Sequence, residues 1–467
     1  MFNIILFGIV VSILMMLINI TYHFRELSNN THGKPDAESD AKLELSHGWI
    51  YAAIILFIIV LLVLSWFLAK GTPWEGHLME WLNIIIRLMH ITFGIAWIGA
   101  SFYFVWLENA LNRKDNVRDE LAGNLWAVHG GGFYYLEKYK VAPKEIPKTL
   151  HWFKYEAYFT WLSGFSLLFV VYYFNAQAFL IDKNVLDISP LTAITIGIGS
   201  FVVAWLLYHF LCKTPLVKKG PWFALVGIII AAGFAYFYTH VFSSRAAYIH
   251  FGAMIGSLMA GNVFFIIIPS QKAMVKAAKE HLPLNPALGK FALLRSIHNN
   301  YFTLPVLFVM VSNHFPSTFG SPHPWLLLMI ISIGTAGVKH WMNLKERGDL
   351  NVWVLPVSVL ILFAAAYMSA PQPPNTDCKA EIPFAEVNAI VERRCKSCHS
   401  SHPTDDVFTA APNGVMYNTP QDIVKLKDKI MQRVVVTKTM PQNNKTNMTD
   451  EERQIINCWI QQGAVVK

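Results

Sequence analysis

Long apolar runs separated by short polar segments occupy the first 370 residues of the chain. A helix needs about 20 apolar residues to cross the ~30 Å hydrocarbon core of a bilayer. Ten runs approach or exceed that length, at residues 3–20, 48–69, 81–107, 156–180, 190–212, 221–242, 246–269, 298–315, 324–343 and 351–370. The pattern predicts an all-α protein, a polytopic transmembrane bundle of about ten helices. The run 3–20 is short, and a signal-like anchor is the alternative there.

The composition changes this picture little. Hydrophobic residues make up 54% of the chain and charged residues 15%, whereas soluble domains carry about 25% charged residues. The formal net charge is +8. If the basic residues lie in alternate loops, that charge reports orientation in the lipid membrane, and it is no argument for binding nucleic acid.

Basic residues do concentrate in alternate connecting segments. Nineteen Lys and Arg residues fall in segments 108–155, 213–220, 270–297 and 339–350, against Lys70, Lys183 and Arg245 in the intervening segments after residue 69. Loops rich in Lys and Arg stay in the cytoplasm. The last apolar run therefore leads out of the cytoplasm, and everything after about residue 370 is predicted to lie outside it.

Four regions follow from the pattern. Residues 1–70 hold two additional N-terminal helices, 71–370 a membrane domain of about eight helices, 371–378 a Pro-rich linker, and 379–467 a tail of soluble composition. Pro-rich segments are stiff and extended spacers. The tail is therefore predicted to be a separate domain.

The tail contains CKSCH, residues 395–399. In a C-x-x-C-H motif two thiols, here Cys395 and Cys398, form thioethers to haem, and the adjacent imidazole, His399, binds the iron. A redox dithiol and a partial zinc site are the alternatives. Covalent haem attachment takes place outside the cytoplasm, which agrees with the side that the loop charges predict.

A methionine after the motif completes the expected ligand pair. Met440, in TMPQNN, follows His399 by 41 residues, and a thioether from that position would make the tail a class I cytochrome c domain with one haem c. Met448 is the competitor, beside a predicted helix start. Pro412 is expected to hold the loop whose carbonyl accepts the His399 ring N–H. Cys378 and Cys458 either form a disulfide or stay unpaired.

Histidines also occur in the membrane runs, where ionisable residues are costly and usually functional. His90, His240, His250 and His314 fall toward the outer half, and His209, His298 and His340 near the inner ends. The outer four are candidate ligands for a haem b in the membrane domain. Hydrogen bonding between helices, or a position at the interface, is the alternative for each.

Three polar stretches, 126–139, 150–164 and 295–305, fall on the side predicted to be cytoplasmic. Their candidate catalytic residues are His129, His151, Lys154, Glu156, Arg295, His298 and Asn299. Arg295 and the residues after it are expected at a helix N-terminus, where the dipole favours anions. The glycines 130–132 either approach a ligand or form a plain turn, and Lys154 and Glu156 either contact substrate or anchor at the membrane boundary.

Four dispersed segments resemble the membrane-bound cytochrome c urate oxidases (urate hydroxylases, PuuD family): WIGASFYFVWLENAL, LHWFKYEAYFTWLSGF, HNNYFTLPVLFVMVSNH and TMPQNNKTNMTDEER. The resemblance runs from about residue 80 to the C-terminus, and residues 1–70 depart from it. It implies oxidation of urate to 5-hydroxyisourate in a bacterial inner membrane, with electrons passing to the fused haem rather than to dioxygen. A downstream cytochrome c or terminal oxidase would take them on.

The expected substrate suits the candidate residues. Urate is a planar monoanion, matched by aromatic walls and by Arg and Asn donors, and His298 or His151 would take its proton. Two other classes remain open: another membrane dehydrogenase with a quinol or porphyrinogen donor, and a non-catalytic subunit that carries electrons or anchors haem.

Overall fold

The structure is a computed structural model that describes residues 64–466, with gaps at 66, 73, 144, 148, 350, 371–377, 379, 406–407 and 409. The chain divides into two compact units, Met1–Leu78 and Met79–Lys467. The predicted helix 3–20, nearly all of 48–69 and the Pro-rich linker lie outside the described residues. Everything below concerns the second unit, together with the start of its first helix.

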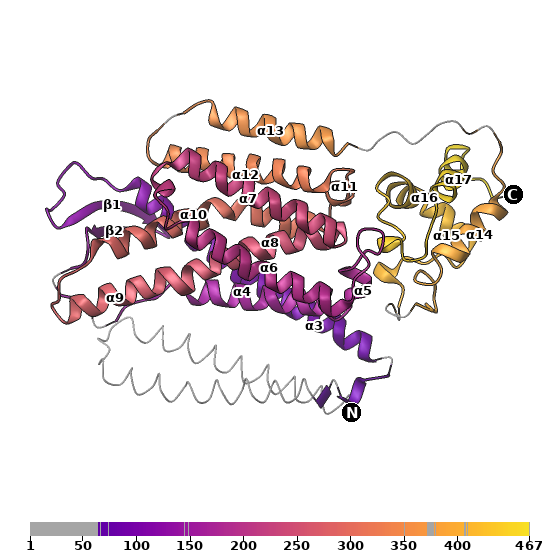
Figure 1. The fold of residues 1–467 in the computed structure, drawn as a ribbon, viewed down its shortest axis with the longest axis horizontal. Coiled ribbons are helices and arrows are strands. Elements are labelled where there is room, and N and C mark those ends of the chain that lie inside the picture. The colour runs from indigo at the N-terminus through magenta and orange to yellow at the C-terminus, as the bar shows by residue number, and fades with distance from the viewer. Residues whose placement is uncertain are drawn as a thin grey trace. The chain divides into compact units, whose positions relative to one another are not determined.

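The second unit is mainly helical (Figure 1). Its longer helices before residue 370 are α3 (Trp74–Ala110), α4 (Tyr155–Leu167), α6 (Pro190–Leu211), α7 (Gly220–Val241), α8 (Ser244–Gly261), α9 (Ile268–Lys279), α10 (Pro286–Ser312), α12 (Pro324–Glu346) and α13 (Val354–Met368). Shorter elements are the π-helices η2 (Leu168–Tyr173) and η4 (Asn262–Ile267), the 3₁₀-helix η3 (Pro215–Lys218), α5 (Ala176–Phe179) and α11 (Pro316–Phe319). Because η4 joins α8 to α9 without a break, these three elements form one continuous rod.

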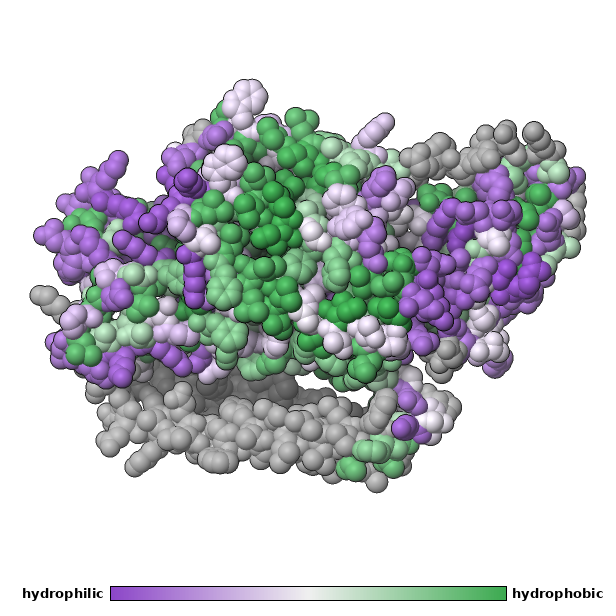
Figure 2. All heavy atoms as spheres, viewed as in Figure 1, coloured by the Kyte–Doolittle hydropathy of each residue, from purple (hydrophilic) through white to green (hydrophobic). Residues whose placement is uncertain are grey.

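Five helical segments within the described part of the chain are long and apolar enough to cross a membrane: Trp74–Ala110, Pro190–Leu211, Gly220–Val241, Ser244–Lys279 and Pro324–Glu346. Figure 2 shows apolar side chains over the flanks of the long helices, and polar ones over the tail. Large apolar side chains such as Leu206 and Ile229 are exposed on these helices. Water would disfavour such surface and lipid accommodates it. The prediction of a mainly helical membrane protein is confirmed at this level.

Helix α8 is the centre of the bundle. Its residues Ala246, Tyr248 and Phe251 are almost completely buried, and it packs against α6, α7 and α10. A helix that is buried on all sides is apolar all round. Gly252 allows α10 to come close, because a Cβ there would lie 2.4 Å from the Val309 side chain.

One part of the all-α prediction is wrong. Strands β1 (Leu121–His129) and β2 (Gly132–Tyr139) form an antiparallel hairpin. Gly130 and Gly131 connect them with φ of 58° and 78°, the positive values that a two-residue hairpin turn of type I′ requires. The glycine triplet is therefore the plain turn, and helical periodicity could not reveal strands in a polar segment.

Residues 270–297 are a second correction, because they were predicted to be a loop. Helix α9 and the first three turns of α10 occupy most of this segment. Arg295 lies nine residues inside α10, so the expected helix N-terminus beside it is wrong; the helix begins at Pro286 with Asn285 as its cap. Lys339, counted in the next loop, lies inside α12. Both side chains are fully buried. Arg295 and Lys339 therefore do not count as loop charges, and only the other basic residues bear on the orientation.

The tail forms a small helical unit with its own core. Its elements are α14 (Phe384–Arg394), η5 (Pro412–Gly414), α15 (Pro420–Lys425), α16 (Lys427–Ile430), η6 (Met431–Val436), η7 (Gln442–Asn444) and α17 (Asp450–Gln461). Val387, Ile390 and Trp459 are buried where α14 meets α17. A disulfide joins Cys378 to Cys458, which decides the alternative that the sequence left open.

Candidate functional site

Arg295 is the centre of a buried polar network in the membrane domain. Its Nη1 donates to Asn262 Oδ1 (3.3 Å) and its Nη2 to the His209 carbonyl (3.4 Å). Its guanidinium carbon lies 4.7 Å from the centre of the Tyr208 ring. The side chain is fully buried. A buried cation is stable only with such acceptors and ring faces around it, so Arg295 ties α10 to α6 and to the start of η4.

His298 lies one turn further along the same helix. Its Nδ1 is 2.9 Å from the Tyr208 hydroxyl and 3.9 Å from Cys212 Sγ, and its ring stacks on Phe223 at 5.1 Å. The same hydroxyl accepts from Asn262 Nδ2 (3.0 Å). With Tyr208 as the donor to His298 Nδ1, a neutral imidazole carries its proton on Nε2. In this arrangement His298 offers its surroundings a donor, and a role as base requires that bond to change.

The amides of Asn262 and Asn299 complete the network. Asn262 Nδ2 donates to Asn299 Oδ1 (2.8 Å), and Asn299 Nδ2 donates to the Met259 carbonyl (3.0 Å). Asn262 is the first residue of η4, and π-helical turns are frequent at functional sites. Arg295 Nε and His209 Nδ1 are buried without a hydrogen-bond partner in the described part of the chain. Arg295, His298 and Asn299 were predicted from the sequence. Asn262, Tyr208 and Cys212 were not, because they belong to other helices and lie far from α10 in the chain.

The other candidate residues lie elsewhere. His129 is exposed at the hairpin turn, and His151 is exposed with its ring 4.5 Å from that of Phe153. The Lys154 amine lies 4.7 Å from the Tyr155 ring at the start of α4. The Glu156 Oε2 atom is buried and has no partner among the residues that the structure describes. Of the predicted pocket, only the three α10 residues form one network.

The four outer histidines each have different neighbours. His250 is fully buried, with Nε2 3.1 Å from the Tyr173 hydroxyl and Nδ1 2.8 Å from the Ala246 carbonyl. His90 Nδ1 lies 3.0 Å from the Thr160 carbonyl. His240 Nδ1 lies 2.7 Å from the Tyr236 carbonyl, and His314 is exposed. His250 does not fit a haem ligand in this arrangement, because both of its ring nitrogens are hydrogen-bonded to protein groups.

The CKSCH motif follows directly on α14. Cys395 caps that helix, and its carbonyl accepts from the His399 backbone N–H (2.9 Å), which folds the motif into one turn. The His399 ring donates from Nδ1 to the Val415 carbonyl (2.9 Å). Val415 ends the η5 turn that Pro412 begins. Since Nδ1 is used in this way, Nε2 is the nitrogen left for an iron, and the residues fit the attachment of a c-type haem.

The environment of the two thiols bears on the alternatives for this motif. Burial raises the pKa of Cys395 to about 12, and burial also raises the pKa of Cys398. A redox dithiol needs a lowered thiol pKa, so this surrounding does not suit one. The described residues contain no cluster of three or more His, Cys, Asp or Glu side chains that could hold a metal ion.

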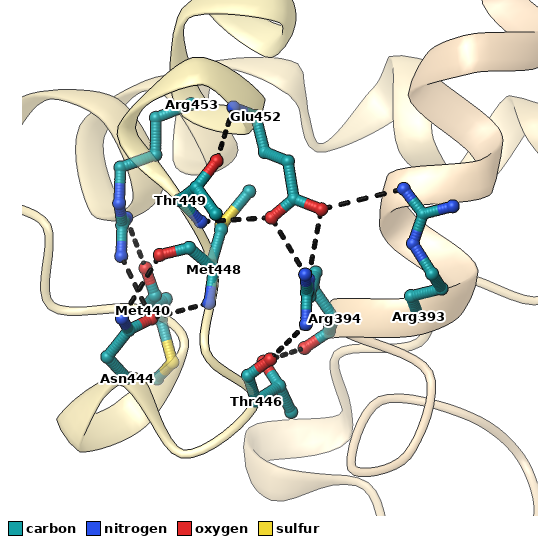
Figure 3. A network of polar contacts seen from close by, with 9 residues as sticks. All are labelled: Arg393, Arg394, Met440, Asn444, Thr446, Met448, Thr449, Glu452 and Arg453. Atoms are coloured by element: carbon teal, nitrogen blue, oxygen red, sulfur yellow. Dashed lines mark hydrogen bonds and ion pairs between the residues drawn. The ribbon is translucent and has the colours of Figure 1, made fainter.

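The two methionines differ in burial. Met448 is 3% exposed and belongs to the core of the tail, whereas Met440 is half-buried in the loop before η7. Arg453 donates from Nη1 to the Met440 carbonyl (2.7 Å) and to the Val434 carbonyl, and so holds that loop to α17. Figure 3 shows both methionines and the bond from Arg453 to the Met440 carbonyl. The half-buried loop position of Met440 suits a ligand to iron, and the core position of Met448 suits packing.

The Glu452 carboxylate connects residues 437–449 around Met440, here called the methionine loop, with α14, the helix before the CKSCH motif. Glu452 closes a capping box with Thr449 at the start of α17 and accepts from Arg394 Nε (3.0 Å) and Arg393 Nη2 (3.5 Å) (Figure 3). Arg394 also donates to the Thr446 carbonyl. Hydrogen bonds between charged groups are shorter and stronger than neutral ones. These charged groups therefore hold the start of α17 and Thr446 against the end of α14.

The methionine loop also contacts the membrane domain. Gln442 Nε2 donates to the Ala178 carbonyl (2.8 Å), and Asn443 Nδ2 donates to the Ala178 and Ile181 carbonyls (2.9 and 3.0 Å). The Phe179 and Phe408 rings lie 5.8 Å apart beside these bonds. Met440 is thus two residues from the contact between the tail and the membrane domain.

The apolar helices and the buried network of α6, α10 and η4 define a membrane protein with a polar site inside its helical bundle. The chain belongs to the family described as urate oxidase N-terminal, whose model matches residues 76–370. The match covers the membrane domain and shows a family concerned with urate oxidation, so the chain is assigned to the oxidoreductases. No curated protein and no solved structure shows significant similarity to the chain.

Proposed function

We propose that the membrane domain oxidises urate to 5-hydroxyisourate and that its electrons pass to a c-type haem held by the tail. The observation that carries this proposal is the union of two parts in one chain. A membrane domain of the urate oxidase family is followed by a CKSCH tail, and the loop of that tail with Met440 hydrogen bonds to the membrane domain.

The reaction sets clear demands on the residues. Urate and one water give 5-hydroxyisourate, two protons and two electrons, and no dioxygen is consumed. A bound c-type haem supplies a one-electron acceptor, so each turnover needs two successive transfers. Tyr208 and His298 would carry protons in the buried network that Arg295 holds together, and Cys395, Cys398, His399 and Met440 would hold the haem.

The direction of electron flow follows from the loop charges. With the basic loops in the cytoplasm, the tail lies outside it, as expected for a bacterial inner membrane protein with covalent haem. Gln442 and Asn443 place the methionine loop against the α5 turn of the membrane domain. Electrons would leave the membrane domain on that side, and a downstream cytochrome c or terminal oxidase would accept them.

The test is a reduction spectrum of the purified, oxidised full chain after addition of urate without oxygen. We expect c-type absorption bands to rise with urate. His298→Asn should slow this reduction at least tenfold, because one charge-neutral hydrogen-bond partner of Tyr208 and the Nε2 donor are lost together. His281→Asn, an exposed histidine, is the matched control and should behave as wild type.

Two outcomes would overturn the proposal. If urate leaves a haem oxidised that dithionite reduces fully, urate is not the donor. If a quinol or a porphyrinogen then reduces the haem in the same preparation, the membrane domain is another dehydrogenase of this general type.

A further inference from the structure

A second buried polar region lies on another face of α10. Asn299 points to α8, as its bond to Met259 shows, while its neighbour Asn300 donates to the Ser101 carbonyl and to Ser101 Oγ, both at 3.4 Å. Consecutive residues of a helix point about 100° apart. Asn300 is fully buried, so α10 carries one polar group toward α8 and another toward α3.

Lys339 of α12 reaches the same place. Its amine lies 4.0 Å from the centre of the Phe102 ring, and Phe102 follows Ser101 in α3. Lys339 is fully buried. Asn343, 2% exposed, follows one turn later on the same face of α12. The bond between Tyr301 and His340 (2.6 Å) joins the next residues of α10 and α12, so the three helices meet at one level, here called the α3 seam.

The α3 seam contains polar atoms with unmet hydrogen bonds. Lys339 Nζ, Asn300 Oδ1 and Asn343 Oδ1 are all buried, and none has a hydrogen-bond partner within the described ranges. A buried polar group without a partner costs about 1–3 kcal/mol, and a charged group costs more. The seam therefore offers one strong donor group and two carbonyl acceptors to something that bonds to both.

A cleft of about 520 Å³ lies at the end of the bundle that carries the hairpin. Its lining includes Asn109, Ile297 and Arg347. Asn109 is eight residues beyond Ser101 and Arg347 is eight beyond Lys339, so the cleft lies about 12 Å along the bundle from the seam. At the cleft, Asn109 accepts from Arg347 Nε (2.9 Å) and donates to Glu346 (3.0 Å).

We propose that Lys339, Asn300 and Asn343 bind the substrate as a planar lactam anion that enters through this cleft. Urate carries negative charge and carbonyl oxygens for the lysine amine, and ring N–H groups for the two amide oxygens. The identity of the ligand rests on the proposed function. The Arg295 network is the weaker candidate for this contact, because its Nη atoms and both Asn299 amide atoms already have protein partners.

The test measures equilibrium binding of radiolabelled urate to the full chain in lipid nanodiscs. Lys339→Met removes the amine and keeps an unbranched side chain of similar volume, so the bundle should still fold. We expect Kd for urate to rise about 10- to 100-fold, the loss of one or two charge-assisted hydrogen bonds. Lys345→Met is the matched control, since Lys345 is exposed on the same helix, and its Kd should stay unchanged.

Asn343→Leu probes the site without changing its charge and should raise Kd about 3- to 10-fold, as expected for a neutral hydrogen bond. Wild-type Kd in both Lys339→Met and Asn343→Leu would overturn the proposal and mean that the α3 seam holds water. If wild type itself binds no urate, the proposed function fails, and that result is distinct from a failure of the seam alone.

Discussion

The tail and the membrane domain use their polar side chains in opposite ways. In the tail, Glu452 pairs with Arg394 and Thr449 at a helix start, where the groups remain in contact with water. In the membrane domain, Arg295 and Asn262 are completely buried and bond to residues of other helices. Ion pairs near water contribute little each, whereas a polar group in lipid or protein interior must find a partner. Local motifs therefore define the tail, and contacts between helices define the membrane site.

This comparison also separates two kinds of function. The tail presents its chemistry in one turn of chain, Cys395 to His399, and holds it with one bond to Val415. The membrane domain assembles its chemistry from α3, α6, α10, α12 and η4, so a change in one helix affects groups on several others. Substitutions in the tail and in the membrane domain test whether the two parts behave in these different ways.

The largest effect should come from His399→Ala. If His399 is the proposed iron ligand, loss of its imidazole removes that ligand, and urate-dependent reduction of the haem should fall to background. Urate binding to the membrane domain should be unchanged in the same preparation. His402→Ala is the matched control, because His402 is exposed in the same loop. Loss of urate binding in His399→Ala would show that the two domains do not act separately.

Arg295→Met should destabilise the membrane domain. The substitution leaves Asn262 Oδ1 and the His209 carbonyl without their donor, at about 1–3 kcal/mol for each unpaired group. Thermal unfolding followed by near-ultraviolet circular dichroism would show a lowered midpoint. Lys290→Met changes an exposed residue of the same helix and should leave the midpoint in place. An unchanged midpoint in Arg295→Met would mean that the network does not hold α6 to α10.

The two methionines should separate in one experiment on the tail. Met440→Ala should lower the haem reduction potential, because a thioether ligand raises it, with little loss of stability. Met448→Ala should keep the potential and lower the free energy of unfolding by about 2–5 kcal/mol, since the side chain is buried. Redox titration and denaturant unfolding read the two quantities. The reverse pattern would make Met448 the ligand.

The smallest effect is expected at Asp450. A hydrogen bond from Lys438 (2.6 Å) is the main cause that lowers the pKa of this carboxyl, and the charge of Lys438 adds to it. Because the folded pKa is depressed, the stabilisation is present above the unfolded Asp pKa of about 3.9. It is lost as the pH falls through the folded value.

Asp450→Asn should therefore reduce the stability of the tail by about 0.5 kcal/mol at pH 7, since the pair is mostly exposed. The difference from wild type should disappear below about pH 3. Denaturant unfolding at both pH values measures it. A difference that persists at low pH would assign the effect to helix capping alone.

Several features could be predicted because their signal is local. The apolar runs predicted the long helices, and the C-x-x-C-H spacing predicted the turn that follows α14. The helix start at Thr449 followed from its capping residues. The hairpin was not predicted, because the side chains of strands alternate with a period of two residues and leave no helical periodicity. The segment before Arg295 was read as a loop because its amphipathic pattern is weak beside the apolar runs.

The apolar runs and the C-x-x-C-H spacing were enough to predict a helical membrane protein with a haem attachment motif after its last apolar run. Hydrophobic length and short spacings are properties of neighbouring residues, so no fold is needed to read them. Only the tertiary structure decided that Tyr208, Asn262 and His298 share one network and that Lys339 is buried beside α3. These residues are far apart in the chain, and the physical reason is that helix packing alone selects which faces meet.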